Sequence, residues 1–340
     1  MGVANATGGW VKKGTRFGPS DVITGTSDNP TIEIRDAQTE VWPTPNRNVG
    51  NFDVRAGGDP MINTADYVLG RPEPMFSVRC PFTLTNYLLI ALSFFQKTSF
   101  LATPNRYSIT PYTRSNIQPA TAGEGGFMTV EAGIGTDSVW RAVGAVCKSW
   151  SATIPSVGSD GGRPELSSDW IAANSTRASA FTGTPTVNTD QVFASYNFEW
   201  AIAASDSGWS ISSPVVVSMD MSWQNAADYS PNIGTTVDAM FLGPLSGSGS
   251  VSILLDAVSA GQFDRLMDAY ESLDPVHFTL NASAFQSYAL LEWDALLQNP
   301  TFSVQGNAIV ATFPWVAARY TSSGRPIAII EHATFAWPNQ

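Results

Sequence analysis

The amino-acid sequence predicts a mainly β protein, a β-sandwich or half-barrel with flanking α-helices. Only 14% of its 340 residues are charged and 43% are hydrophobic, whereas about a quarter of the residues in an average soluble domain are charged. Glycine (28 residues) and proline (22 residues) supply turns, and the many aromatic and β-branched residues favour strands. Helical periodicity is confined to two segments, so we expect strands to form most of the core.

The first predicted helix covers about residues 84–96. Apolar residues recur there at the spacing of one helix face, at Leu84, Tyr87, Leu88, Ala91, Leu92 and Phe95. Thr83 or Thr85 can serve as the N-cap, because a threonine hydroxyl accepts a hydrogen bond from an unpaired backbone N–H. The apolar stripe is expected to cover one face of a sheet.

The second predicted helix covers about residues 259–272. The same periodicity is found at Phe263, Leu266, Met267 and Tyr270. Ser259 and Gln262 have the spacing of a capping box, which predicts the start of the helix. Pro275 cannot continue a helix, so we expect the helix to end after Asp274.

Strand-like segments surround both helices and repeat in the same order. In each half of the chain an opening strand, a long loop, a second strand and a helix precede several further strands. The opening strands are 31–35 and 215–223, and the strands before the helices are 75–82 and 249–255. The later strands are 106–111, 127–131, 139–146, 148–154 and 165–172 in the first half, and 276–280, 287–294, 301–305 and 308–317 in the second. This order predicts a β unit duplicated in one chain.

The repeat divides the chain into four predicted parts. Residues 1–30 form an N-terminal arm, which is expected either to become ordered against a partner or to be a disordered tail. Residues 31–173 form the first β unit, and residues 174–211 form a connector with edge strands. Residues 212–340 form the second β unit and a C-terminal arm.

The residue patterns of common enzymes and metal sites are incomplete in this sequence. The two histidines, His277 and His332, have no cysteine or second histidine at metal-ligand spacing. No complete glycine-rich nucleotide loop occurs. A loose set of carboxylates on predicted strands leaves a glycosidase-like pair open, at Asp220, Glu292 and Asp294. We therefore predict a protein that is not an enzyme and that uses no cofactor and no metal.

Charge and hydropathy restrict the possible partners. The formal net charge of −11 and the pI near 4.6 disfavour tight nucleic-acid binding, although a repelling surface suits DNA that must slide past a wall. The N-terminus lacks the apolar core of a signal peptide, and the longest apolar run is too short to span a bilayer. We expect synthesis in a cytoplasm and no membrane contact. Cys80 and Cys147 are expected to be reduced core residues rather than a disulfide.

The tryptophans leave a second class of function open, a carbohydrate-binding or adhesive β-sandwich. Indole rings stack on sugars, although in strands they more often pack in a core. Seven candidates lie mostly in predicted strands, at Trp150, Trp170, Trp200, Trp209, Trp223, Trp293 and Trp315.

Several stretches between about residues 74 and 338 carry a resemblance to a known family. The first helix leads into PYTRS and GGFMTVEAGIG, and then into VWRAVGAVCKSWSATIPS, which looks like a central pair of strands around a small-residue turn. SPVVVSMDMSWQNAADYSP enters a long polar loop, GPLSGSGSVSILLD leads to the second helix, and NPTFSVQGNAIVATFPWVAAR looks like a late hairpin. Together they resemble the tail tube proteins of long-tailed bacteriophages.

The resemblance implies a structural protein of the virion tail that is made in the host cytoplasm. Another virion component, such as a capsid or baseplate protein, would share most of the composition. Copies of the chain would form rings, favoured as three duplicated chains with pseudo-sixfold symmetry, with a homohexamer as the other arrangement. Stacked rings would contact other tail proteins and enclose a channel that DNA passes without specific binding. Acidic side chains would line this lumen, and the candidates beside one predicted hairpin are Asp160, Glu165 and Asp169.

Overall fold

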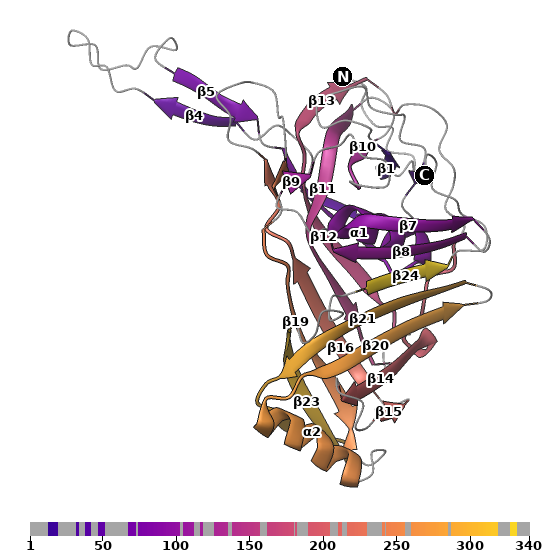
Figure 1. Ribbon diagram of the computed structural model, residues 1–340. Coiled ribbons are helices and arrows are strands. Elements are labelled where there is room, and N and C mark those ends of the chain that lie inside the picture. Colours follow the sequence, from indigo (N-terminus) through magenta and orange to yellow (C-terminus); the bar gives the residue numbers. More distant parts are fainter. Residues whose placement is uncertain are drawn as a thin grey trace.

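The computed structural model is a mainly β protein with two α-helices (Figure 1). Before residue 74 it describes five strands, which are β1 (Lys13–Pro19), β2 (Ile32–Glu33), β3 (Gln38–Val41), β4 (Arg47–Asn51) and β5 (Tyr67–Pro72). From residue 74 on it describes residues 74–102, 105–111, 116–117, 126–134, 138–156, 162–179, 181, 190–204, 210–212, 216–229, 240–241, 243–255, 260–284, 287–318 and 327–331. Every strand pairing among these residues is antiparallel.

The first layer, which we call the main sheet, has the strand order β3-β6-β12-β11-β16-β19-β23-β22. Its strands alternate buried apolar and exposed polar residues, the pattern of a sheet with one solvated face. Their bounds are β6 (Met75–Pro81), β11 (Ser138–Ile154), β12 (Glu165–Ile171), β16 (Val216–Gln224), β19 (Ser246–Leu254), β22 (Thr301–Gln305) and β23 (Ala308–Ala317).

The second layer, which we call the second sheet, has the order β15-β14-β20-β21-β24-β8-β7. It joins the main sheet where the end of β21 pairs with the end of β23. The bounds are β7 (Gln96–Ala102), β8 (Asn105–Pro111), β14 (Phe198–Ala204), β15 (Ser210–Ser212), β20 (Val276–Ala284), β21 (Ser287–Leu297) and β24 (Ile327–Glu331).

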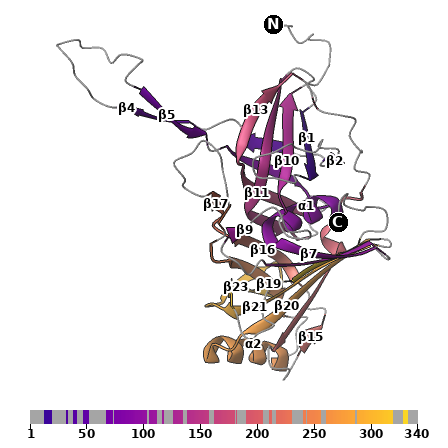
Figure 2. The same cartoon turned by 45° about the horizontal axis from the view of Figure 1, so that its top comes forward.

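A single long strand, β11, links the main sheet to a third group of strands. Its first half pairs with β10 (Met128–Ile134) and β13 (Asn174–Ala178), and β10 also pairs with β1 (Figure 2). The prediction of two strands around a turn at this point was wrong. Gly144 has a φ of +64°, but the chain continues in the same direction through a local irregularity instead of reversing.

Helix α1 (Leu84–Phe95) confirms the first predicted helix, with Thr83 as its N-cap: the Thr83 hydroxyl accepts a hydrogen bond from the backbone N–H of Asn86 at 3.2 Å. All twelve residues of α1 are buried. The helix therefore covers more than the one sheet face expected, because it packs against β11 of the main sheet and against β7, β8, β21 and β24 of the second sheet. This position makes α1 the centre of the core.

Helix α2 (Ala260–Ser272) confirms the second predicted helix, and it packs against the end of the sheets (Figure 1). Ser259, the predicted N-cap, lies outside the described residues. The helix ends before Asp274. Leu273 adopts a left-handed conformation (φ +57°), and the backbone N–H of Asp274 donates to the carbonyl of Ala269 at 3.0 Å.

Aromatic rings fill the space between the main and second sheets. The ring of Trp223 lies 6.1 Å from that of Trp293 at an interplanar angle of 90°, and 6.0 Å from that of Trp315. Phe278 stacks on Trp293 with ring centroids 5.3 Å apart. Gly247 leaves room for this cluster, since a Cβ there would lie 2.5 Å from the Trp223 ring. The two predicted β units share this core and one sheet, so their division at residues 174–211 stays a prediction.

The long predicted loops contain short strands. In the first loop, β4 and β5 form a hairpin that projects from the body of the molecule (Figures 1 and 2). In the second loop, β17 (Asp228–Tyr229) and β18 (Met240–Phe241) join β9 (Asn116–Ile117) in a small sheet. The predicted late hairpin is confirmed by β22 and β23, with Gly306 at a φ of +64° in the turn.

Candidate functional surface

The outer face of the main sheet is polar. Along β16, Met219, Met221 and Trp223 are buried, whereas Asp220, Ser222 and Gln224 are exposed. Because neighbouring strands keep the same alternation, their polar side chains share one face. We call the polar part of this surface the hydroxyl face, and it consists of Ser77, Arg79, Ser149, Ser151, Thr153, Glu165, Ser167, Asp169, Asp220, Ser222, Gln224, Ser246, Ser248, Ser250, Ser252 and Thr312. The exposed Met75 and the partly buried Pro314 and Val316 lie on the same side of the sheet.

Strand register arranges the hydroxyl groups in rows across the sheet. Ser151 on β11 lies opposite both Ser167 on β12 and Ser222 on β16. Farther along, the Oγ of Ser252 and the Oγ1 of Thr312 are 2.8 Å apart and form a hydrogen bond. Most side chains of the face are short, so the surface presents many hydrogen-bonding groups with few long projections.

Two of the three carboxylates of the hydroxyl face, Glu165 and Asp169, accept hydrogen bonds from near neighbours. Both Nε and Nη2 of Arg79 donate to Oε2 of Glu165, the former at 3.0 Å. The hydroxyl of Ser149 donates to Oδ2 of Asp169 at 2.8 Å. Asp220 lies opposite threonine and serine positions on its neighbouring strands. The named charges of this face are thus three carboxylates and one guanidinium.

The structure brings together two of the three acidic residues predicted for a lumen. Glu165 and Asp169 are exposed on the hydroxyl face, both on β12, while Asp160 lies outside the described residues. Sequence reasoning missed Asp220 as a member of this set and treated it as a loose carboxylate. The alternation of apolar and polar residues in MDMSWQ of β16 was the available signal in the sequence. Only the pairing of β16 with β11 places Asp220 next to the strand that also pairs with β12.

The other predicted carboxylates lie apart from the hydroxyl face. Glu292 and Asp294 belong to β21 in the second sheet. Oδ1 of Asp294 lies 2.8 Å from Nδ1 of His277 on the paired strand β20, so the carboxylate is held in a local pair. Asp220 is therefore not paired with them as a glycosidase-like couple. His332 lies outside the described residues.

Cys80 and Cys147 are both buried free thiols. Burial raises the pKa of each thiol, for Cys80 to about 12. Among the residues that the structure describes, no group of three or more histidine, cysteine, aspartate and glutamate side chains is placed to hold a metal ion. In the same residues, no helix has the length and apolar character needed to cross a membrane.

The tryptophan side chains proposed for sugar stacking are in the core. Six of the seven are at most 6% exposed, namely Trp150, Trp170, Trp200, Trp223, Trp293 and Trp315. The seventh, Trp209, lies outside the described residues. The six buried rings cannot stack on a sugar, so they give no support to the carbohydrate-binding class.

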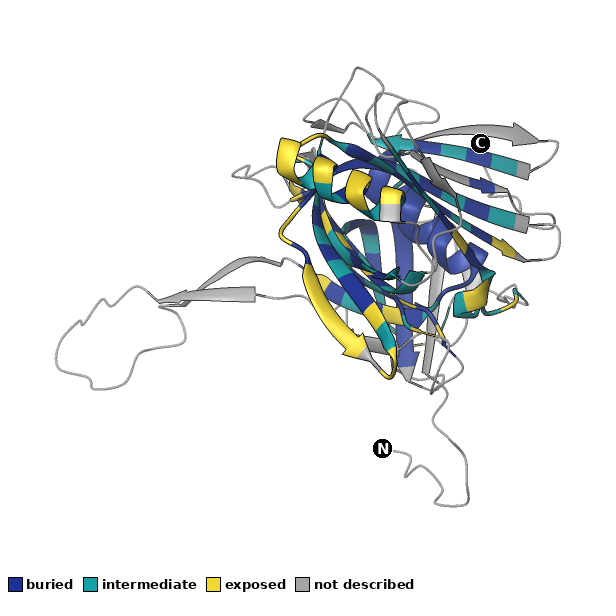
Figure 3. Ribbon diagram, turned by 90° about the horizontal axis from the view of Figure 1, so that it is seen from below, coloured by how far each residue is buried: buried dark blue, intermediate teal, exposed yellow. Residues whose placement is uncertain are grey.

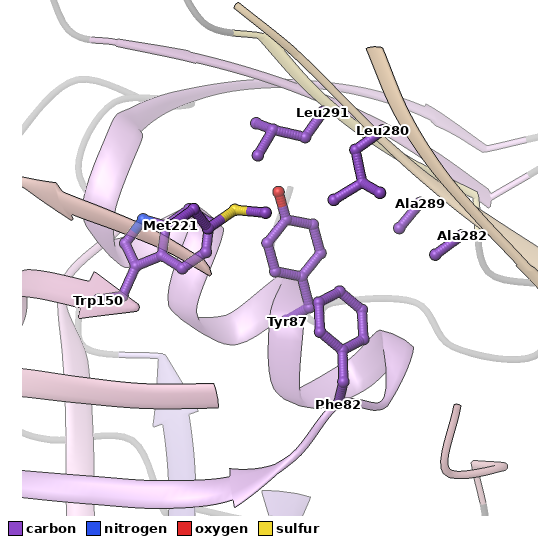
Figure 4. Close-up of a pocket in the computed structure, with 8 residues that line it drawn as sticks. All are labelled: Phe82, Tyr87, Trp150, Met221, Leu280, Ala282, Ala289 and Leu291. Atoms are coloured by element: carbon purple, nitrogen blue, oxygen red, sulfur yellow. The ribbon is translucent and has the colours of Figure 1, made fainter. Parts of the chain in front are cut away.

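A small cavity lies between α1 and the two sheets (Figure 4). It is lined by Phe82, Tyr87, Trp150, Met221, Leu280, Ala282, Ala289 and Leu291. The hydroxyl of Tyr87 points into this apolar space and has no hydrogen-bond partner among the described residues. The space is about the size of one water molecule, too small for an organic ligand.

Strand β22 forms an exposed, partly apolar margin of the main sheet (Figure 3). It pairs with β23, and no second partner strand occurs in the described part of the chain. Phe302, Val304 and Ile309 are 54%, 73% and 45% exposed. Phe302 contacts Phe263 of α2, with ring centroids 6.1 Å apart, so the exposed side chains continue the apolar face that α2 covers.

No protein-family model matches the chain, and no curated protein matches its sequence.

Proposed function

We propose that the chain is a non-enzymatic structural subunit of a bacteriophage tail tube. In this proposal, copies assemble side by side into rings, and the hydroxyl face lines a channel through which DNA passes. The observation that carries the proposal is the hydroxyl face itself: a broad sheet surface of short hydroxyl side chains with three carboxylates and one paired guanidinium.

This surface suits passage without binding. DNA binds proteins chiefly through contacts between phosphates and lysine or arginine side chains, and such contacts release counterions. A wall with net negative charge repels phosphates instead. Serine and threonine hydroxyls keep the wall hydrated, while the overall charge of −11 adds long-range repulsion.

The margin at β22 supports self-association. A strand with one unpaired edge and exposed apolar side chains is a template for pairing with another chain. Pairing of this margin with a neighbouring subunit would cover Phe302, Val304 and Ile309 and extend the main sheet. Repetition of one such head-to-tail contact generates a closed ring or a filament.

More specifically, we propose that the chain contains two copies of a tail-tube-like fold. Three chains would then form a pseudo-sixfold ring, and a ring of six chains is the other arrangement. Rings would stack in the virion tail and contact other tail proteins, without membrane contact. The ground for proposing the duplication is the repeated order of predicted elements around residues 84–96 and 259–272 of the sequence.

Negative-stain electron microscopy of the purified protein tests the proposal. We expect rings or stacked tubes with a central channel, and class averages that distinguish three-chain from six-chain rings. A protein that stays monomeric over wide ranges of protein and salt concentration contradicts it. A closed shell or a different large assembly would instead assign the chain to a capsid or baseplate.

A further inference from the structure

We infer that two copies of the free chain pair through strand β22 in a two-fold dimer, and that this dimer keeps the β22 margin out of a ring. The dimer itself goes beyond the proposed function, whereas its role in holding back assembly rests on that function. The partner is a second copy of this chain, bound through the same strand. Such a two-fold contact differs from the head-to-tail contact of the proposed ring, although both would use β22.

Strand β22 is an open sheet edge without the features that usually protect one. Its five residues, TFSVQ, include no charged side chain and no proline, and its pairing with β23 has no irregularity. Sheet edges in native proteins usually carry charges, prolines or bulges that prevent pairing with another chain. Within the described ranges, β23 is the only strand that pairs with β22. An edge of this kind favours the addition of a strand from another chain.

The free backbone groups of β22 belong to Phe302 and Val304. The two-residue turn of the hairpin makes Gln305 and Ala308 a hydrogen-bonded pair. Hydrogen-bonded and non-hydrogen-bonded pairs alternate in an antiparallel ladder, so Ser303 also bonds to β23. The N–H and C=O groups of Phe302 and Val304 therefore point away from β23, toward the open edge.

A two-fold axis at Ser303 pairs all of these groups at once. When two β22 strands pair in antiparallel fashion about this axis, Phe302 of each copy lies opposite Val304 of the other. These are the hydrogen-bonded pairs of the new ladder, and the two Ser303 residues form the non-hydrogen-bonded pair between them. A register centred on Phe302 would instead place Val304 opposite Pro300, which has no N–H. The backbone of β22 thus selects one self-complementary register.

The same register also matches the side chains. Phe302 and Val304 share one face of β22, on which Phe302 contacts Phe263 of α2, and both are more than half exposed. Two cross-strand pairs of phenylalanine with valine would lie side by side in the dimer, next to the exposed Ile309. Pairs of aromatic with β-branched residues stabilise antiparallel sheets. Ser303 lies on the opposite face, so the dimer brings serine against serine there.

Cysteine cross-linking of the full-length protein tests this register. Opposed residues of a non-hydrogen-bonded pair have Cα atoms about 4.5 Å apart, a distance that a disulfide can span. Ser303→Cys should therefore form a disulfide-linked dimer under mild oxidation. Thr301→Cys is the matched control, because this position is exposed on the same strand and face. In the proposed dimer the two copies of residue 301 are roughly 14 Å apart, too far for a disulfide.

We expect severalfold more cross-linked dimer from Ser303→Cys than from Thr301→Cys at equal protein concentration. The wild type should give none, because Cys80 and Cys147 are buried. In a head-to-tail ring the Ser303 residues of neighbouring copies do not meet, so that contact alone gives no preference for Ser303→Cys. Equal yields from the two variants would overturn the dimer.

Negative-stain microscopy of reduced and oxidised Ser303→Cys tests the role in assembly. The reduced protein should form rings and the oxidised dimer should form none, and rings from the oxidised dimer would overturn this role. If the reduced protein forms rings but the two variants cross-link equally, the dimer is refuted and the proposed function stands. If Ser303→Cys cross-links preferentially but no rings form in either state, the dimer stands, and the proposed function and the role in assembly are refuted together.

Discussion

The side-chain amide of Asn225 caps the last turn of the central helix: its Nδ2 donates to the carbonyl of Phe94 at 3.0 Å. The same nitrogen donates to the carbonyl of Cys147 at 3.1 Å, and Oδ1 accepts from the backbone N–H of Ala227 at 3.1 Å. Asn225 is 3% exposed. One side chain thus satisfies backbone groups of α1, β11 and its own loop.

Replacement of Asn225 by alanine should lower the free energy of unfolding by about 3 kcal/mol, because buried carbonyls and an N–H lose their partners. The neighbouring exposed residue provides the control, and Gln224→Ala should change stability by less than about 0.5 kcal/mol. Urea unfolding followed by tryptophan fluorescence measures both. Equal midpoints for the two variants would show that the amide has no such role.

Tyr87→Phe should leave stability unchanged or raise it by about 1 kcal/mol. The mutation removes a buried hydroxyl without a partner in the described residues, and an unsatisfied polar group in an apolar cavity is unfavourable. Tyr196, 70% exposed, serves as the control, since Tyr196→Phe should have no effect. A loss of more than about 1 kcal/mol in Tyr87→Phe would indicate a hydrogen bond to the hydroxyl in solution.

The buried thiol of Cys80 should make stability fall at alkaline pH. Burial raises its pKa from an ordinary value of 9.0 to about 12, so below pH 9 the thiol is protonated in both states and has no effect. Between pH 9 and 12 the unfolded chain loses the proton while the native protein keeps it. This contributes a decrease in unfolding free energy of about 1.4 kcal/mol per pH unit.

Cys80→Ala should reduce that slope, whatever its effect on absolute stability. Chemical denaturation at intervals between pH 8 and about 11 measures the slopes. The pKa of Cys147 is also raised by burial, so Cys80→Ala keeps a residual slope from that group. Parallel pH profiles for wild type and Cys80→Ala would refute the assignment.

Leu273→Gly should stabilise the C-terminus of α2 by about 1 kcal/mol. Leu273 has a φ of +57°, a conformation that glycine adopts without the Cβ penalty, and the Leu273 side chain is 68% exposed. Leu273→Ala retains the Cβ and should give no such gain. Thermal unfolding of the three proteins distinguishes the backbone effect from loss of the side chain, and equal melting temperatures for the two variants would contradict it.

Val304→Lys should weaken the proposed assembly without unfolding the subunit. Val304 is 73% exposed on β22, so the ammonium group of a lysine there is solvated in the monomer. In the proposed assembly the same charge would be covered by the neighbouring subunit, which is unfavourable. Sedimentation velocity should show smaller species than the wild type at equal concentration. Thr301→Lys, on the other face of the same strand, is the control for charge alone, and identical sedimentation of all three proteins would exclude this margin from assembly.

Local patterns in the sequence predicted the elements well. Helix α1 with its Thr83 cap and the hairpin of β22 and β23 are each formed by residues that are close in the sequence. Rules based on neighbouring residues were therefore sufficient to predict them. The burial of α1 on all sides was not predictable in this way, because the helix face opposite its stripe contacts strands far away in the sequence.

The hydroxyl face required tertiary pairing for its recognition. Glu165 and Asp169 were predicted from a hairpin next to them, but Asp220 joins them only through the pairings of β11 with β12 and β16. The interpretation of Gly144 as a turn failed for a related reason. A glycine between apolar segments suits both a reversal and an irregularity, and the neighbouring strands β10, β12 and β13 decide in favour of one continuous strand.

The 17-residue strand β11 has a mechanical consequence. Its first half is bonded to β10 and β13 and its second half to β12 and β16, so a force applied to the β1–β10 side reaches the main sheet along covalent backbone. To part the two groups of strands, the load must shear a whole row of hydrogen bonds at once instead of opening them one by one. The molecule should therefore resist pulling along β11 far better than pulling across it.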